Sequence, residues 1–310
     1  MTARLDPFVL EHAPGPLVEL DPALVRARVA CAALLGALAA IDDDKLTCQW
    51  MWGDNAADIR YGFYRAFEII ESASSAVSRA VAAQPSSEAR DAVAAAAASR
   101  WALHGVLATL SDADLDADPG GAEWTIRRTM QHIINSQRGY AWSSAYWLSV
   151  RDQPRLPGPQ RAPADVLSDF PEEEEETLGS LASVRQGLDD IVDVTSSRFA
   201  TLTDADLQVM GGWSGFPVTI GFRQWRWSSH IAEHTIQIEK TIDMLGKRRS
   251  EVDWLVRLLG RAFGNLGPTV FGRDSAGAAG PVLDLVARDL DALRLSLTAA
   301  AHAAVPAEEW

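Results

Sequence analysis

The sequence predicts an all-α protein, built as an up-and-down four-helix bundle with additional helices at both ends. Apolar residues form 47% of the 310-residue chain, which is enough for a sizeable core. Long stretches rich in Ala, Leu, Val and Ile have helical spacing, whereas alternating β-branched runs bounded by turns are few. A unit of helix, acidic turn, tryptophan and helix recurs along the chain, and two paired units make a bundle.

The predicted helices follow one another closely. In chain order they are residues 22–41, 55–83, 88–110, 124–150, 178–202, 221–246, 250–264 and 280–303. The first contains the most apolar segment, Val29 to Ile41, which has about 13 residues, whereas a membrane span needs about 20. We therefore expect a core helix there and no membrane partner. Several prolines and a run of glutamates predict a loop from Arg151 to Thr177 that crosses the bundle.

The recurring unit is clearest in two places. Ser111 and Thr203 each begin an Asp-Ala-Asp-Leu turn, and Trp124 and Trp213 follow these turns. The segment 42–46, with two tryptophans after it, resembles a third and degenerate copy. The predicted domains are an N-terminal helical extension (1–86), the metal-binding bundle (87–249) and a C-terminal helical extension (250–310).

The charge of the chain excludes one class of partner. A formal net charge of −14 opposes nucleic-acid binding, because phosphate contacts need clustered cations. Two cysteines, Cys31 and Cys48, are too few for a disulfide framework and are expected to be reduced. The first residues lack a basic start followed by an apolar stretch, so we expect no signal peptide and a cytoplasmic location.

Three of the six histidines predict a metal site. His230 and His234 stand four residues apart, so on a helix they share one face and can chelate one ion. Ile231 and Ile238 flank them, which predicts that this face turns inward, where imidazoles need partners. Aligning the repeated units puts His132 at the place of His230. Three neutral imidazoles can hold a first-row divalent ion and leave a position open for substrate, which favours catalysis.

The remaining histidines and the first repeated unit are interpreted differently. His12, His104 and His302 are expected to be ordinary core or surface residues, although His104 lies in an apolar helix and could line the cavity. The first unit lacks the histidine, because the alignment puts Arg65 in its place. We expect Arg60 and Arg65 to make structural ion pairs, and binding of a carboxylate or a sugar hydroxyl is the alternative.

One pattern joins these features. Trp124 precedes His132, the long loop follows, and then comes His230-Ile-Ala-Glu-His234 with Ile238 and Leu245-Gly246 after it. In this pattern, residues of about 88–247 resemble the DinB/YfiT-like superfamily, which includes the mycothiol-dependent maleylpyruvate isomerase amino-terminal domain and bacterial thiol S-transferases. The resemblance covers about half of the chain. It implies a four-helix bundle with a divalent metal held by histidines matching these three. Zinc or nickel is the expected metal, and iron or manganese is the alternative.

The resemblance also implies a reaction class. Members of the family join low-molecular-weight thiols to electrophiles, use mycothiol in an isomerisation, or were first labelled hydrolases. A thiol coordinated by a metal is deprotonated and becomes a nucleophile. We therefore expect a metal-dependent thiol S-transferase with a small-molecule substrate, and a composition typical of a GC-rich genome favours mycothiol as the thiol. A metal-dependent hydrolase and a non-catalytic stress protein that binds metal are the alternatives.

The role of Glu233 is open at this stage. His230-Ile-Ala-Glu-His234 also matches inverted zinc metallopeptidases, whose glutamate activates water and whose third ligand is a later acidic residue, for which Glu239 and Glu251 are candidates. In a bundle, Glu233 is a candidate catalytic base, a hydrogen-bond partner of a ligating histidine, or a solvent-facing residue.

Substrate-binding residues are expected beside the histidines. Tyr140, Arg223 and Trp225 are the candidates, because small-molecule pockets combine aromatic walls with a few polar anchors. The helices at 22–83 and 250–303 exceed a single bundle. They could enclose the substrate, form a homodimer face, or stabilise the fold.

Overall fold

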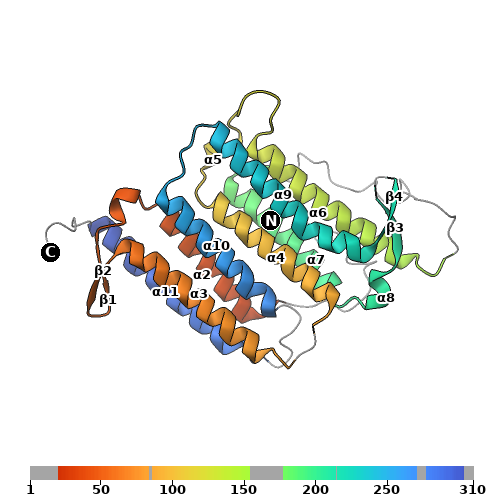
Figure 1. Cartoon of the computed structure of the whole chain (residues 1–310), viewed down its shortest axis with the longest axis horizontal. Helices are drawn as coiled ribbons and strands as arrows, with labels where there is room; N and C mark the ends of the chain where they lie inside the picture. The colour runs from red at the N-terminus through yellow and green to blue at the C-terminus, as the bar shows by residue number, and fades with distance from the viewer. Residues whose placement is uncertain (1–19, 84–85, 154–176, 214, 271–276, 304–310) are drawn as a thin grey trace. The chain divides into compact units, whose positions relative to one another are not determined.

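The computed structural model describes residues 20–83, 86–153, 177–213, 215–270 and 277–303 (Figure 1). These residues are mainly helical, and the strands among them form two short hairpins, so the predicted all-α class is confirmed. Most of the predicted loop after Arg151 lies outside the described residues. The chain divides into two compact units, each with its own core. Unit 1 contains residues 86–100 and 111–245, and unit 2 contains residues 20–85, 101–110 and 246–310.

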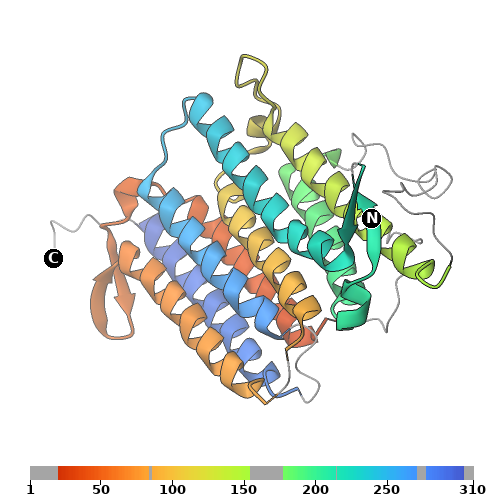
Figure 2. The same cartoon turned by 45° about the vertical axis from the view of Figure 1, so that its right-hand side comes forward.

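Unit 1 is the predicted four-helix bundle. Its long helices are α4 (Glu88–Leu107), whose last turns belong to unit 2, α6 (Ile126–Ser149), α7 (Leu181–Phe199) and α9 (Ile220–Met244). Helices α6 and α9 lie side by side (Figures 1 and 2) and run antiparallel. Lys240, near the end of α9, bonds to Glu123 just before α6, at 2.7 Å. Gln137, further along α6, donates to the carbonyl of Trp227 near the start of α9, at 3.0 Å.

Polar side chains set where the helices of unit 1 begin. Thr125 accepts a hydrogen bond from the N–H of Arg128 at the start of α6, and Thr219 accepts one from Phe222 at the start of α9. The two Asp-Ala-Asp-Leu turns are the short helices α5 (Asp112–Leu115) and α8 (Asp204–Leu207). Each begins with a capping box, in which the hydroxyl residue before the helix and the second aspartate bond to each other's backbone N–H: Ser111 with Asp114, and Thr203 with Asp206. The shared capping box explains why the turn recurs.

Each unit contains a hairpin that helical spacing did not predict. The pairs are β1 (Gln49–Trp52) with β2 (Asn55–Asp58) in unit 2, and β3 (Met210–Trp213) with β4 (Phe216–Thr219) in unit 1. The helix expected at 55–83 is therefore wrong at its start, because α3 (Ile59–Ala80) begins after β2. Gly53 and Gly215 have φ values of +60° and +88°, a region that glycine adopts without a Cβ clash, and so allow these turns.

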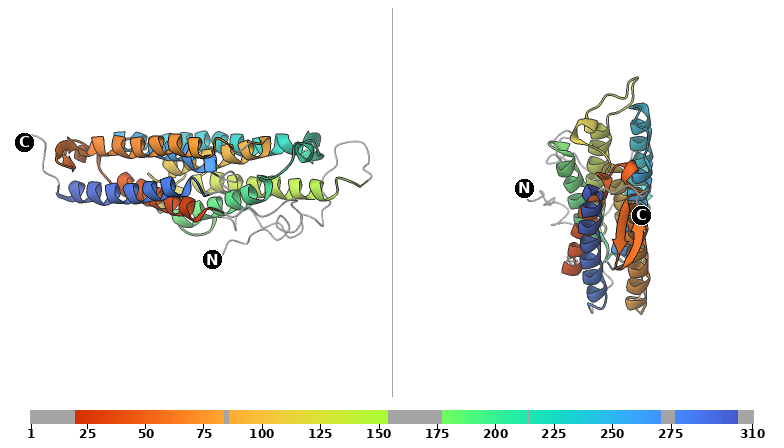
Figure 3. Two further views of the ribbon diagram at one scale, coloured as in Figure 1. Left: turned by 90° about the horizontal axis from the view of Figure 1, so that it is seen from below. Right: turned by 90° about the vertical axis from the view of Figure 1, so that its left-hand side faces the viewer.

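Unit 2 combines helices from both predicted extensions. Besides α3 these are α2 (Pro22–Ala39), α10 (Glu251–Val270) and α11 (Gly280–Ala303). Helix α11 runs alongside α2 and α3 (Figures 2 and 3), and Leu34, Phe63 and Leu290 are among the residues buried between them. Helix α10 continues beyond its expected end at residue 264, and Leu266 and Val270 in the added turns are buried.

The order of elements repeats between the two units. The succession of helix, short turn, hairpin and helix occurs once in each unit. In unit 2 it consists of α2, the short turn η1 (Asp43–Lys45), the first hairpin and α3. In unit 1 it consists of α7, α8, the second hairpin and α9. The ring of Trp52 packs edge-on against Tyr61 with centroids 5.8 Å apart, and Trp213 meets Phe222 at 5.6 Å. The degenerate copy seen in the sequence therefore forms the same succession of elements.

Helix α2 is the one helix among the described residues whose length and hydropathy would suit a membrane span. Its Leu34, Leu35 and Leu38 have no exposed surface, because they pack in the core of unit 2. Packing therefore accounts for the apolar composition of α2, and the cytoplasmic location stays a prediction.

Candidate metal centre

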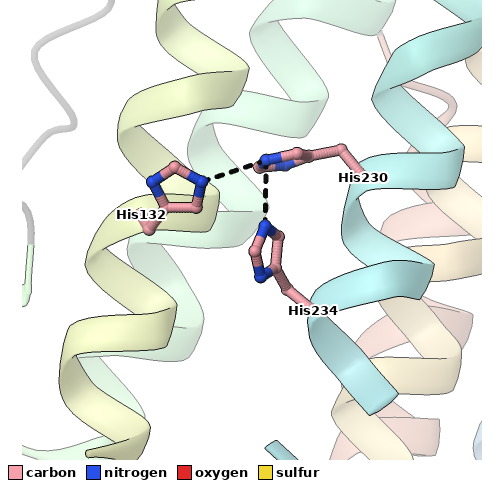
Figure 4. A group of neighbouring side chains, drawn as sticks. All are labelled: His132, His230 and His234. Atoms are coloured by element: carbon pink, nitrogen blue, oxygen red, sulfur yellow. Dashed lines mark hydrogen bonds between the residues drawn. The ribbon is translucent and has the colours of Figure 1, made fainter. Parts of the chain in front are cut away.

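Three histidines from two helices of unit 1 point at one another. His132 lies on α6, and His230 and His234 lie one turn apart on α9 (Figure 4). The Nε2 atom of His230 is 3.3 Å from Nε2 of His132 and 3.1 Å from Nε2 of His234. One ring nitrogen from each of the three lies within 4.8 Å of the others. The predicted convergence of these histidines is present.

The spacing of the nitrogens suits a small divalent ion. Two ligands of a tetrahedral ion with bonds of about 2.0–2.1 Å lie roughly 3.3 Å apart. The two Nε2 separations of 3.1 and 3.3 Å are close to that value. This cluster of three histidines, with no carboxylate, is the one group of potential metal ligands found among the described residues. It can hold a metal ion and leave a coordination position open.

The reason for the convergence differs from the one expected. Aligned on their caps Thr125 and Thr219, the two helices place Arg226, not His230, at the position of His132, so the expected equivalence of the histidines is wrong by one turn. The antiparallel course of α6 and α9 brings His132 opposite His230 instead. The register between the helices therefore builds the site.

His230 is the innermost ligand. It is 3% exposed, and the ring of Tyr140 stands edge-on to it with centroids 5.6 Å apart. Burial, together with repulsion from the protonated forms of the neighbouring His234 and His132, lowers the pKa of His230 to about 3. The imidazole is therefore neutral at physiological pH, which is the form that binds metal.

His234 has a partner that sequence reasoning missed. Its Nδ1 lies 2.7 Å from Oε1 of Gln237 on the next turn of α9. The amide oxygen accepts the Nδ1–H, so the lone pair of Nε2 faces the cluster, as in metal sites whose ligands are oriented by an outer hydrogen bond. The i+3 spacing of His234 and Gln237 was the available signal.

Glu233 pairs with an arginine on its own helix. It is exposed, and its carboxylate forms an ion pair with Arg226 at 2.6 Å. The hydrogen bond from Arg226 lowers the pKa of Glu233, against a smaller opposing effect of burial. Gln237, and not Glu233, is therefore the hydrogen-bond partner of the outer nitrogen of His234. The carboxylate stays ionised and faces solvent beside the cluster.

The three expected substrate-binding residues separate into two groups. Tyr140 and Arg223 are 8% and 4% exposed and lie on the facing sides of α6 and α9. Trp225 is 41% exposed on the opposite side of α9, and its indole N–H donates to Glu88 at 3.1 Å. The structure does not bring Trp225 to the histidines.

The other candidate residues have structural contacts. Arg60 forms an ion pair with Glu251 at 2.6 Å, and Arg65 pairs with Glu68, so the expected ion pairs are confirmed. His104 is buried against Trp101 in unit 2 rather than in the three-histidine cluster, with ring centroids 5.4 Å apart. His302 lies in the exposed last turn of α11, and His12 is outside the described residues.

Comparison with known proteins connects this geometry to a family. The family model of the DinB superfamily matches residues 95–238, a segment that contains all three histidines. Residues 95–238 belong to the DinB superfamily. No curated protein and no solved structure gives a significant match. Most of the DinB-like segment lies in the helical bundle of unit 1, and its three histidines are a candidate metal centre.

Proposed function

We propose that this DinB-like protein is a cytoplasmic, metal-dependent thiol S-transferase. One observation carries the proposal: three imidazole nitrogens of α6 and α9 lie within 4.8 Å of one another, and the two Nε2 separations from His230, 3.3 and 3.1 Å, suit a tetrahedral ion. Zinc and nickel are the proposed metals, and mycothiol is the proposed thiol. When bound, the ion would supply the positive charge that favours the thiolate form of a coordinated thiol.

The side chains around the cluster suit this reaction. The thiol loses its S–H proton to solvent, its sulfur forms a bond to an electrophilic carbon, and the leaving group departs with the electron pair of its bond. His132 is the more accessible ligand, whereas His230 and Tyr140 are buried, so the thiol would approach from the side of His132. Gln237 holds His234 in the tautomer that a ligand requires.

The test combines metal analysis with turnover. Purified protein is loaded with zinc or nickel and assayed with monochlorobimane and a panel of thiols: cysteine, glutathione and mycothiol. The proposal predicts thiol-dependent fluorescence that is lost in His132→Ala together with the metal, and retained in His302→Ala, whose histidine is exposed on α11. Bound metal without turnover with any thiol would contradict the transferase and favour the non-catalytic binding protein.

A further inference from the structure

Arg223 is a buried cation that has no anionic partner among the residues that the structure describes. Its side chain is 4% exposed, and the hydrogen bond that satisfies it goes to the backbone carbonyl of Gly212. Its Nε is buried and has no hydrogen-bond partner. Burial lowers the pKa of Arg223 to about 10, although the Tyr140 hydroxyl opposes this. A buried guanidinium without a counter-ion is costly, so a fold that keeps one needs a reason.

Arg100 in the same unit shows what a structural arginine looks like. It is 1% exposed, and it forms ion pairs with Asp193 at 2.7 Å and with Asp189 at 3.3 Å. Burial lowers the pKa of Arg100, but the two carboxylates outweigh burial and raise it. Arg100 therefore has counter-ions supplied by the chain, whereas no ion pair joins Arg223 to a carboxylate of the described residues.

Arg223 shares a strip of α9 with the metal ligands. It precedes His230 by seven residues, which is two turns and about 10 Å along the helix axis, and His234 continues the same strip. Tyr140 from α6 stands against His230. Burial raises the pKa of the Tyr140 hydroxyl, and the charge and hydrogen bond of Arg226 and the charge of Arg223 oppose the rise. Near the cluster, Arg226 is already paired with the carboxylate of Glu233, whereas Arg223 and the Tyr140 hydroxyl are not paired with a carboxylate of the described residues.

We propose that Arg223, with Tyr140, binds a carboxylate group of the ligand whose reacting end lies at the three histidines. The unpartnered Nε–H of Arg223 can donate to a carboxylate oxygen, and a guanidinium is the side chain whose planar N–H groups best match a carboxylate. The carboxylate belongs either to the electrophile or to the thiol, and the same arginine would neutralise it in both cases. This inference rests on the proposed function for the reacting end, but the binding of the carboxylate needs no metal.

The experiment measures binding to the zinc-loaded full chain by calorimetry. Phenylacetate and its neutral amide probe a carboxylate on the electrophile, and N-acetylcysteine and N-acetylcysteine amide probe one on the thiol. In at least one pair, the acid is expected to bind at least tenfold more tightly than the amide. Arg223→Met should remove that preference, Arg223→Lys should retain part of it, and Arg288→Met, an exposed arginine of α11, should not change it.

Stability separates a binding role from a structural one. Arg223→Met removes an uncompensated charge, so its Tm should equal or exceed that of the wild type, whereas Arg100→Met removes the cation that pairs with Asp193 and Asp189 and should lower Tm. Acids that bind no better than amides, acid binding unchanged in Arg223→Met, or preference for inorganic phosphate would each overturn the proposal. Zinc content is measured for every variant, so that failure of the proposed metal site can be recognised separately. Such a failure would remove zinc, but the preference for acids over amides would still depend on Arg223.

Discussion

At the scale of residues, the histidine cluster depends on how each imidazole is oriented. Gln237 fixes the tautomer of His234 by accepting its Nδ1–H, while His230 is held by burial between the helices and by the ring of Tyr140. A ligand that is already neutral and oriented loses little freedom when it binds an ion. Gln237 therefore contributes to metal affinity without being a ligand.

Gln237→Leu should weaken zinc binding by about 10- to 100-fold, the usual effect of removing an outer hydrogen bond of a ligand. Competition with a chromophoric chelator measures this change. Gln186→Leu is the matched control, since Gln186 bonds to Asp190 on the surface of α7, far in sequence from the ligands. Equal affinities of wild type and Gln237→Leu would show that His234 needs no such orientation.

The residue types of the site were readable from sequence, but their contacts were not. The i, i+4 spacing of His230 and His234 predicted a shared helix face, and that is a local property. The pairing of Glu233 with Arg226, seven residues earlier on the same helix, is a side-chain contact that the spacing of the histidines does not predict. Trp225 was expected near the site from sequence proximity alone, and helix rotation places it on the other side.

At the scale of elements, the antiparallel register of α6 and α9 and the starts of the helices determine the site. Caps at Thr125 and Thr219 fix the starts, and capping signals of this kind are visible in sequence. The register between two helices depends on packing across the bundle, which no local pattern encodes. For the same reason the two hairpins were missed, because four-residue strands are too short for a recognisable alternation.

The crossing of α4 and α10 in unit 2 depends on two glycines. A Cβ added to Gly260 would lie 2.9 Å from Cα of Gly105 and from the carbonyl oxygen of Trp101. Backbone atoms cannot move aside as a side chain can, so Gly260→Ala should destabilise the protein by about 1–3 kcal/mol. Gly36→Ala in α2 meets nothing within 4 Å and should stabilise it by up to about 1 kcal/mol. Chemical denaturation measures both, and equal effects would contradict the close crossing.

Asp43 caps a helix that is distant in sequence. Its carboxylate accepts the N–H groups of Glu251 and Val252 at the start of α10, each at 3.0 Å. Burial opposes its ionisation, but these hydrogen bonds outweigh burial and lower the pKa of Asp43. Because the pKa is lower in the folded state, the stabilisation is present at neutral pH. The stabilisation is lost as the pH falls below the pKa of the unfolded state, about 4, and then through the lower pKa of the folded state.

Asp43→Ala should therefore reduce the free energy of unfolding by about 1 kcal/mol at pH 7. The difference from wild type should shrink as the pH is lowered through the range of carboxyl titration. Asp44→Ala, an exposed neighbour whose nearest cation is 3.8 Å away, is the control and should have little effect. A deficit of Asp43→Ala that persists unchanged at pH 3 would contradict an ionised cap.

At the scale of the whole molecule, the metal ligands all belong to one of two units. His132, His230 and His234 lie in unit 1, and unit 2 has a separate apolar core formed by α2, α3, α10 and α11. The sequence predicted the terminal helices individually. It could not predict that helices from both ends share one core, because apolar faces do not specify their partners.

Removal of metal should therefore affect the two units differently. Hydrogen exchange followed by mass spectrometry, with and without a chelator, should show faster exchange in α6 and α9 after metal removal. Peptides from α2, α3 and α11 should exchange at unchanged rates. Acceleration of the same size in both groups would mean that the ion stabilises the molecule as one cooperative unit.

The most direct test of the metal centre is the zinc stoichiometry of the reconstituted protein, determined by elemental mass spectrometry after removal of free zinc. Convergence of the three imidazole nitrogens within 4.8 Å predicts one zinc ion per wild-type chain and none in His230→Ala. Wild-type protein without bound zinc, or His230→Ala that retains a full equivalent, would contradict the three-histidine metal centre.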